Sequence, residues 1–430
     1  MKDFYLKPKF FDSIKTYSKE QLLKDIIAGI IVAIIALPLS IALAIASGAE
    51  PQQGIYTAIF AGFIVALLGG SNVQITGPTA AFATVVAGVI RDYENSGLVI
   101  ATLMAGIILI FMGVLKLGAL IKYVPKTTTV GFTAGIAVTI AIGQIKDFLG
   151  ITYQTSKPVI ETFDKLKENI HNISSFGWQS LVIGAICLAI LIIYPKLEKR
   201  VPPSLIAVIV GVVMVALIPI FKSNVSTIGT AFKDLQGGLP TFKLSTKDIN
   251  LDLVVSLIPS AFAIAFLAGV ESLLSCVVAD GMTKDKHNPN SELVAQGLGN
   301  MASVAFGGIP ATGAIARTAA NIKNGGRTAV SGMIHSIILL LVVVFLMPYA
   351  KLIPMPTIAA ILFIVAYNMS EWRSFLKIIK QKNITDILIM VLTFVLTVAK
   401  DLVVAIIIGL ALHFAILLIK KLIYKSRKKA

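Results

Sequence analysis

Long apolar runs, interrupted at fairly regular intervals, dominate the hydrophobic pattern of this chain. Most runs hold about 20 residues, the length that a helix needs to cross a bilayer core of roughly 30 Å. Glycine, proline or charged clusters separate them. The pattern predicts an all-α membrane protein with fourteen transmembrane spans, at residues 23–47, 52–69, 76–90, 97–116, 127–146, 178–194, 203–221, 253–279, 292–307, 311–322, 328–347, 352–367, 383–399 and 401–420.

The composition excludes an ordinary soluble protein. The 430 residues are 56% hydrophobic and only 14% charged, whereas soluble chains carry roughly 25% charged residues. Cys187 and Cys276 both lie in apolar runs and offer neither a disulfide framework nor a metal-ligand spacing. The polar, basic N-terminus lacks the short apolar core of a signal peptide. We therefore expect residues 1–22 to form a cytoplasmic leader.

The net charge of +16 follows the predicted topology. An even number of spans places both termini on one side of the membrane. Counted loop by loop, 26 of the 38 basic residues fall on that side, 11 fall on the other, and Arg317 lies within a span. Because cytoplasmic loops carry the excess of Lys and Arg, both termini are predicted to be cytoplasmic. The basic surplus therefore indicates orientation, and we expect no nucleic-acid partner.

The third and tenth spans share an unusual opening. Residues 69–81 and 307–314 each contain a Gly-Gly pair, an extended stretch with a proline, and then threonine and small residues. Such a break is tolerated at membrane depth only where it is buried in protein or lines a cavity. Seven spans separate the two breaks, so they enter from opposite sides. This predicts an inverted repeat with two facing half-helices and a ligand site at the membrane midplane.

Two half-helix N-termini that face one spot form a natural anion site, because each presents unpaired N–H groups and partial positive charge. Arg317 lies about one turn into the tenth span, where an uncompensated charge is costly, so we expect it to face the cavity. Other interpretations stay open. The small residues could simply permit helix packing, and Arg317 could reach the membrane surface or act as a structural counter-ion.

Glu271 is the only carboxylate predicted to lie well inside a span. An intramembrane acid of this kind indicates a site for a proton or a coupling cation. The alternative is a fixed ion pair between Glu271 and Arg317 that stabilises the fold.

Several motifs in both halves of the chain resemble those of the SulP family of anion permeases, which includes sulfate and bicarbonate transporters and is related to the motor protein prestin. They are residues 37–44 (LPLSIALA), 51–56 (PQQGIY), 75–81 (ITGPTAA), 269–273 (GVESL) and 307–332 (GGIPATGAIARTAANIKNGGRTAVSG). The similarity is expected to cover residues 20–420.

The resemblance implies a seven-plus-seven inverted repeat in which a core domain moves against a gate domain. The first-repeat spans 1–5 occupy residues 23–146, with spans 1–4 in the core and span 5 in the gate. The rest comprises gate spans 6 and 7 within residues 147–221, core spans 8–11 within 253–347, gate spans 12–14 within 348–420, and a basic cytoplasmic tail at 421–430. Family members usually continue into a cytoplasmic STAS domain, which we do not expect in this sequence.

Carried over from the family, the anion site comprises Leu39, Leu43, Thr79, Ala80, Ala314, Ile315, Ala316 and Arg317, with Glu271 as the acid for the coupling ion. Some relatives have glutamine in place of Leu39 and a hydroxyl residue in place of Ala316. Fewer side-chain hydrogen bonds to the substrate are therefore expected here.

These observations predict a secondary active transporter of a small oxyanion in the cell membrane, with sulfate favoured over bicarbonate or a dicarboxylate. Elevator-like alternating access and coupling to H⁺ or Na⁺ are expected, without another cofactor. The expected partners are the anion and the lipid bilayer, with a homodimer as one possible assembly. The alternatives are a nucleobase permease of the same fold and a passive anion channel, exchanger or voltage-responsive motor. An enzyme is not expected, because no nucleophile, base and metal constellation shares a face.

Overall fold

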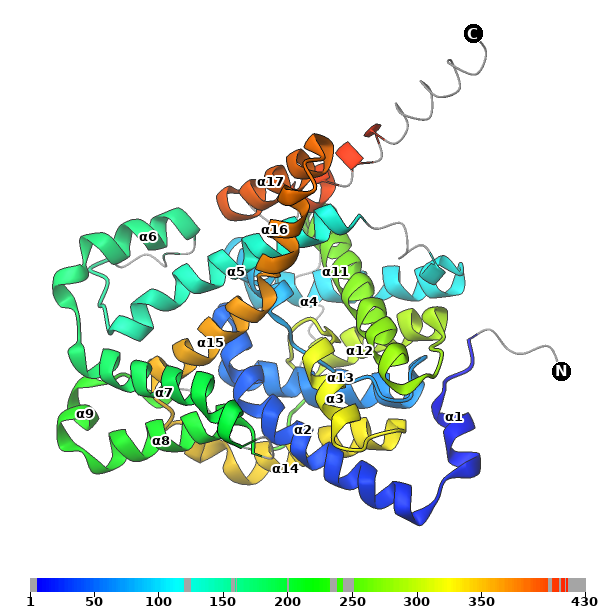
Figure 1. Cartoon of the computed structure of the whole chain (residues 1–430), viewed down its shortest axis with the longest axis horizontal. Helices are drawn as coiled ribbons and strands as arrows, with labels where there is room; N and C mark the ends of the chain where they lie inside the picture. Colours follow the sequence, from blue (N-terminus) through cyan, green and yellow to red (C-terminus); the bar gives the residue numbers. More distant parts are fainter. Residues whose placement is uncertain are drawn as a thin grey trace, which may run out of the picture.

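The computed structural model describes residues 6–119, 125–155, 159, 161–198, 201–232, 238–242, 251–400, 404–409, 411–413 and 415–416. Within these ranges the chain is almost entirely helical (Figure 1). The first half contains α1 Phe10–Ser13, η1 Ile14–Thr16, α2 Lys19–Ala46, α3 Pro51–Leu68, β1 Thr76–Gly77, η2 Ala80–Phe82, α4 Ala83–Val114, α5 Lys126–Leu149, α6 Thr162–His171, η4 Ile173–Ser175, α7 Trp178–Leu197, α8 Pro203–Leu217, α9 Pro219–Asn224 and α10 Ile228–Ala231.

The second half contains α11 Leu251–Thr283, α12 Pro289–Ala305, β2 Thr312–Gly313, α13 Ile315–Lys323, α14 Ala329–Ala350, α15 Met355–Met369, α16 Trp372–Lys380 and α17 Ile384–Ala399. Seven of the described helices are long and apolar enough to cross a membrane: α2, α3, α4 with η2, α5, α7, α11 and α14. Helices α8 and α17 are apolar but shorter. The predicted span at 401–420 is described only in part, at residues 404–409, 411–413 and 415–416.

The long helices pack into two groups (Figure 1). In the first, α12 packs on α3 and α4, α11 on α4 and α13, and α14 on α2 and α3. In the second, α5 packs on α15 and α17, and α7 packs on α8 and α15. The two groups meet mainly where α2 contacts α8 and α15, and where α4 contacts α5. Each group therefore combines helices from both halves of the sequence.

Glycine permits close contacts between these helices. A Cβ atom on Gly297 of α12 would lie 2.5 Å from the carbonyl oxygen of Gly106 on α4. A side chain at this position would force the two helices apart. Small residues at such positions allow membrane helices to pack backbone against backbone.

The boundary between the third and fourth predicted spans differs from the expectation. Residues 91–96 were expected to form a loop, but the structure has one helix, α4, interrupted only at Glu94. Glu94 has a φ of 57° and a ψ of −167°, which breaks the helix direction at a single residue. The polar stretch between the two apolar runs therefore forms a kink rather than a loop.

Two other predicted boundaries also shift. The seventh predicted span, 203–221, divides into α8 and α9 because Ile218 is extended and Pro219 begins a new helix. The twelfth predicted span begins at Met355, three residues later than expected, behind the N-cap residue Pro354. In both cases proline sets the start of the helix, as its fixed φ favours.

Candidate functional site

The two breaks in the chain meet in a short antiparallel ladder at the centre of the first helix group. β1 pairs with β2 so that Thr76 faces Gly313 and Gly77 faces Thr312. The N–H of Ala314 also donates to the Ile75 carbonyl at 2.8 Å. Helical structure resumes three residues after β1, at η2, and two residues after β2, at α13. Both helical segments therefore start beside the same ladder.

Side chains from neighbouring helices satisfy the backbone of the first break. The N–H of Gly70 donates to Glu292 Oε2 at 2.9 Å, and the N–H of Ile75 donates to Thr318 Oγ1 at 3.0 Å. Asn321 donates to the Val73 carbonyl at 3.0 Å. Because buried backbone groups have no water to bond, these polar side chains allow an extended segment inside a helical protein.

The second break is satisfied in the same way. Asn300 of α12 accepts from the N–H of Ala311 at 2.8 Å and donates to the carbonyl of the same residue at 2.9 Å. Thr57 Oγ1 of α3 accepts from the N–H of Ile309 at 2.8 Å. The hydroxyl of Ser272 on α11 accepts from the N–H of Gly313 at 2.9 Å. Three helices thus fix the second extended segment.

A pair of glutamines links each break to the helix that precedes the other. Gln53 of α3 donates to the Gly307 carbonyl in the second break at 3.1 Å, and Gln296 of α12 donates to Thr76 Oγ1 in the first break at 3.0 Å. Each glutamine is followed directly by glycine in the sequence. The two halves of the chain therefore exchange equivalent contacts across the ladder.

Arg317 lies at the ladder and does not reach the surface. Its side chain is buried, with 3% of the residue exposed. Nη2 donates to the Pro78 carbonyl, between β1 and η2. A Cβ atom on Gly77 would come within 2.6 Å of Nη1, so only glycine leaves room for the guanidinium there. The alternative in which Arg317 reaches the membrane surface is therefore wrong.

Nη1 of Arg317 has no hydrogen-bond partner among the described residues. Glu271 does not supply one, and its Oε2 accepts from the Thr79 hydroxyl at 2.9 Å. The salt bridges within the described part of the chain include no pair between Glu271 and Arg317. The guanidinium and the carboxylate thus lie at one site without neutralising each other directly.

The remaining predicted site residues divide into two sets. Ala80 and Ala314 are buried at the two helix starts, and Ile315 and Ala316 follow with exposed side chains. Leu39 and Leu43 lie in the middle of α2, where Leu43 is buried and Leu39 half-buried. These leucines pack into the same hydrophobic core as Ala80. A hydrogen bond thus joins Thr79 to Glu271, and another joins Arg317 to Pro78, the residue before Thr79, whereas the leucines are linked to the site only by core packing.

Two further carboxylates are more completely buried than Glu271, although only Glu271 lies well inside a predicted span. Glu292 and Asp25 are both fully buried, whereas Glu271 is half-buried. Glu292 accepts hydrogen bonds from the N–H of Gly70 and from Gln296. Asp25 accepts from the hydroxyls of Tyr17 and Thr328. Both lie near the start of a predicted span. Charged residues are common at helix termini, so nothing in the sequence indicated that either of them belongs to a site.

His335 of α14 is a polar residue that the sequence did not single out. It is fully buried, and neither ring nitrogen has a partner in the described part of the structure. A Cβ atom on Gly62 would lie 3.8 Å from Nδ1 and 3.2 Å from the Thr76 carbonyl, which places the imidazole near β1. Its surroundings in an apolar span gave no sign of this.

The arrangement can hold an anion. The starts of η2 and α13 each present helix N–H groups and about half a positive charge, and the buried guanidinium of Arg317 adds a full one. Anions bind readily at such helix N-termini. Among the described residues, no group of three or more His, Cys, Asp or Glu residues could hold a metal ion.

Comparisons with known proteins agree on one family. The sequence pattern of the sulfate permease family matches residues 22–393. "Putative sulfate transporter YvdB" of Bacillus subtilis is 42% identical over 410 residues, which cover 94% of this chain and 75% of that protein. "Bicarbonate transporter BicA" of Picosynechococcus sp. is 35% identical over 395 residues, which cover 90% of this chain and 68% of that protein.

Solved structures agree in fold. The transmembrane domain of a cyanobacterial bicarbonate transporter, BicA, matches with a TM-score of 0.78 and 32% identity, covering 90% of this chain and 98% of that domain. SLC26A9 matches with a TM-score of 0.84 over 97% of this chain and 68% of its own, at 18% identity, and shows the fold alone. The prediction of an all-helical, multi-pass membrane protein is confirmed.

Proposed function

Because the chain belongs to the sulfate permease family, we propose that it is a secondary active transporter of a small oxyanion, with sulfate as the substrate that the site favours. The family is one of transporters, so the expectation that the protein is not an enzyme is confirmed. The resemblance that the sequence motifs indicated is also confirmed. The substrate, the coupling ion and the transport mechanism are our proposals.

The observation that carries the proposal is the buried Arg317 beside two helix starts. The helix starts contribute about one positive charge together, and Arg317 adds another. An ionised Glu271 subtracts one, which leaves about +1. Protonation of Glu271, or a sodium ion beside it, raises the sum to about +2. That charge suits a dianion such as sulfate.

The same arithmetic supports cation coupling. Glu271 is held only by the Thr79 hydroxyl among the hydrogen bonds of the described residues. A proton would neutralise its charge, and a sodium ion beside it would compensate that charge. Thr79 directly precedes η2, where the anion is expected to contact the helix start. Cation binding at Glu271 therefore strengthens anion binding a few residues away, and we propose H⁺ or Na⁺ symport.

We further propose fourteen spans in a seven-plus-seven inverted repeat, with both termini cytoplasmic. The two helix groups support a division into a core of spans 1–4 and 8–11 and a gate of spans 5–7 and 12–14. The ladder lies within the first group, so movement of that group against the second carries the anion site with it. This motion is an elevator-like form of alternating access.

Purified protein in liposomes tests the proposed function. Uptake of labelled sulfate, bicarbonate and a dicarboxylate is measured with and without an imposed proton or sodium gradient. We expect sulfate to accumulate above its external concentration only when a cation gradient is imposed. Accumulation that never exceeds equilibrium under any gradient would instead indicate a passive channel.

The same assay tests the alternative that the protein is a nucleobase permease. A neutral base does not require the buried charge of Arg317, so we expect excess uracil to leave sulfate uptake unchanged. Displacement of sulfate by uracil, or uptake of uracil in place of sulfate, would contradict the assignment to an oxyanion.

A further inference from the structure

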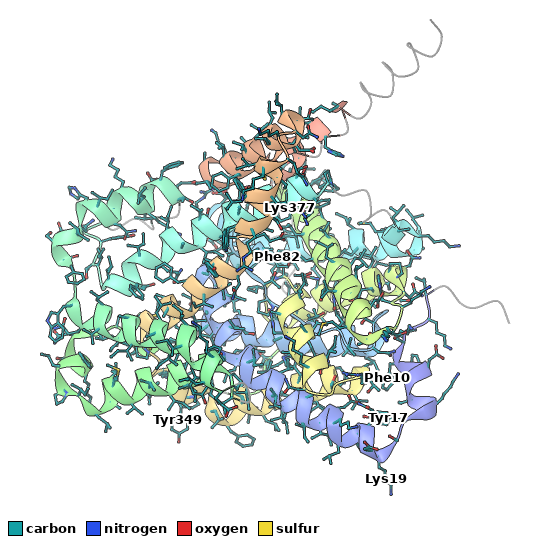
Figure 2. All side chains as sticks on the ribbon, in the orientation of Figure 1. Phe10, Tyr17, Lys19, Phe82, Tyr349 and Lys377 are labelled. Atoms are coloured by element: carbon teal, nitrogen blue, oxygen red, sulfur yellow. The ribbon has the colours of Figure 1, made fainter. Side chains whose placement is uncertain are left out.

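Helix α16 joins two apolar helices, α15 and α17, and one of its faces is anchored to the protein. Ile378 is buried in a cluster with Val130 of α5 and Met390 of α17, and Phe375 packs against the same cluster. This contact fixes the rotation of α16, so the directions of its other side chains are determined. Figure 2 labels Lys377 on this helix.

A second face of α16 is apolar and exposed. Trp372, Leu376 and Ile379 are 43%, 44% and 40% exposed, and their spacing of four and three residues places them on one side of a helix. The following helix, α17, continues with an exposed apolar stripe at helical spacing, formed by Ile384, Leu388, Val391 and Val395. A stripe of this kind on an apolar helix of a membrane protein faces lipid.

A third face of α16 is basic. Arg373, Lys377 and Lys380 are exposed on the side next to the apolar face, and Lys382 follows directly after the helix. None of them forms a salt bridge with a described residue. The Arg373 guanidinium lies 5.3 Å from the centre of the Trp372 ring.

The acidic residues near α16 do not balance these charges. Glu371 precedes the helix, and Asp386 lies in the first turn of α17, where it accepts a hydrogen bond from Asn383 at 2.6 Å. Residues 371–386 thus carry four basic and two acidic side chains. The excess positive charge lies beside an apolar face that has no protein partner in the described structure.

We propose that α16 is an interfacial binding site for anionic phospholipid headgroups. A helix with adjacent apolar and basic faces lies in the plane of the membrane interface, with its apolar side at the boundary between headgroups and acyl chains. Trp372, Leu376 and Ile379 occupy that boundary. Arg373, Lys377 and Lys380 extend to headgroup phosphates, where each basic side chain adds about fivefold to the preference for anionic lipid.

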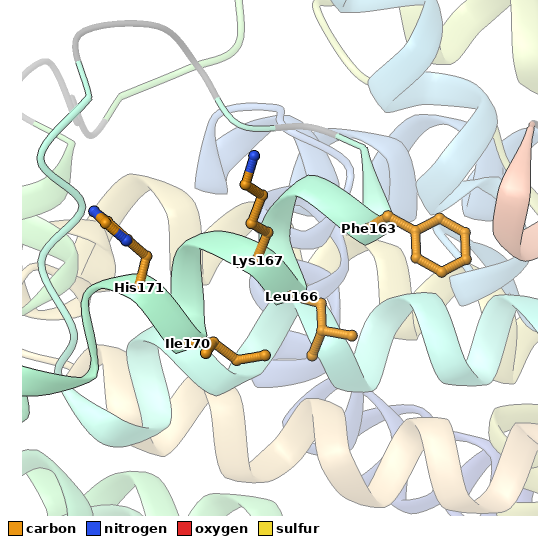
Figure 3. A pocket seen from close by; sticks show the side chains of 5 residues that line it. All are labelled: Phe163, Leu166, Lys167, Ile170 and His171. Carbon is orange, nitrogen blue, oxygen red and sulfur yellow. The ribbon is translucent and has the colours of Figure 1, made fainter.

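Helix α6 provides a comparison within the same protein. It has a surface hollow of about 370 Å³, lined by Phe163, Leu166, Lys167, Ile170 and His171 (Figure 3). Phe163 and Ile170 are exposed, so α6 also has an unpartnered apolar face. Its charges are balanced, however, because Asp164 and Glu168 accompany Lys165 and Lys167. We therefore expect no preference for anionic lipid there.

The two tryptophans allow α16 and the segment that follows α6 to be measured separately. The chain has only Trp178 and Trp372. Trp178→Phe leaves Trp372 on α16 as the sole indole, and Trp372→Phe leaves Trp178, shortly after α6 at the start of α7. Each protein is reconstituted in vesicles that mix phosphatidylcholine with phosphatidylglycerol, and one lipid at a time carries brominated chains that quench tryptophan fluorescence.

We expect brominated phosphatidylglycerol to quench Trp372 with an apparent association constant at least fivefold above that of brominated phosphatidylcholine. The ratio should fall toward one in 1 M salt, which screens charges beyond about 3 Å. It should also fall in the triple variant Arg373→Gln, Lys377→Gln and Lys380→Gln. For Trp178 the ratio should stay near one throughout.

Equal quenching of Trp372 by the two lipids, or an undiminished preference in the triple variant, would overturn the proposal. Quenching of Trp178 in the triple variant with Trp372→Phe checks that this protein still inserts and folds. If the triple variant does not insert and fold, the proposal is judged from the salt titration of the Trp178→Phe protein. The result is independent of which anion the protein transports.

Discussion

The Thr79 hydroxyl donates a hydrogen bond to Glu271 Oε2 across 2.9 Å, which joins the residue before η2 to the middle of α11. η2 starts at the chain break where an anion is proposed to bind, and α11 carries the half-buried carboxylate of Glu271. One hydrogen bond therefore links the charge of Glu271 to the proposed anion site. The proposed cation coupling depends on this contact.

Glu271→Gln should remove the coupling while preserving the contact. The amide has the size of the carboxylate and accepts from Thr79, but it neither ionises nor gains a proton. We expect sulfate uptake into liposomes to lose its acceleration by a proton or sodium gradient, while exchange of sulfate for sulfate continues. Glu20→Gln, at an exposed carboxylate in the first turn of α2, serves as control. A Glu271→Gln protein that keeps full gradient dependence would remove this residue from the mechanism.

Gly54→Ala should destabilise the contact between α2 and α3. A Cβ atom on Gly54 would lie 2.0 Å from the Ser40 carbonyl oxygen, so the helices must separate. Overpacking of this kind costs about 1–3 kcal/mol. Gly88→Ala is the matched control, because nothing lies within 4 Å of its Cβ position. Thermal unfolding in detergent should show a lower midpoint for Gly54→Ala alone. Equal midpoints for the two variants would contradict this packing.

The N-terminal segment should contribute a stability that is lost in alkali. Tyr17 lies outside the predicted spans and donates to Asp25 at 3.0 Å. Partial burial and the Asp25 carboxylate raise the pKa of Tyr17 from 10.0 to about 12. The folded state therefore favours the neutral phenol. Its contribution to the free energy of unfolding is complete below pH 10 and falls as the pH rises to 12.

The measurement for Tyr17 compares unfolding of the wild type and Tyr17→Phe between pH 9 and 12. We expect the stability difference between the two proteins to shrink across this interval. The pKa of Tyr153 is also raised to about 12 by burial and nearby carboxylates, but Tyr153 is present in both proteins and cancels. A difference that stays constant or grows with pH would show that Tyr17 is not held in its neutral form.

The sequence predicted most of the helices because bilayer crossing imposes a length on each apolar run. It also identified the breaks at 69–81 and 307–314, since Gly-Gly and proline interrupt helices visibly. It did not predict that Thr76 and Gly77 pair with Thr312 and Gly313. Such pairing depends on how helices distant in the sequence pack, and no local pattern records it.

The side chains that bond the backbone of the two breaks could not be predicted from the sequence either. Glu292 and Asn300 resemble polar residues at the end and on the face of any helix, yet each bonds backbone inside the protein. The repeated Gln-Gly at 53–54 and 296–297 was the available signal, because equivalent residues of an inverted repeat tend to play equivalent roles. His335 gave no signal, because one histidine in an apolar run does not reveal what it faces.

The position of Arg317 could be predicted only in part. The cost of a charge at membrane depth indicated a buried site, and the residue is indeed 3% exposed. The sequence could not predict that Arg317 donates to the Pro78 carbonyl, or that Gly77 leaves the space for its guanidinium. An ion pair with Glu271 was the alternative that the sequence left open, and the salt bridges of the described residues do not include it.

Binding of labelled sulfate to the purified Arg317→Ala protein tests the central claim most directly. Loss of a charge-assisted hydrogen bond costs roughly 1.5–3 kcal/mol, so the dissociation constant should rise about 10- to 150-fold. Lys323→Gln, at an exposed basic residue of the same helix, should leave it unchanged. An unchanged sulfate affinity in a folded Arg317→Ala protein would contradict an anion site at the ladder.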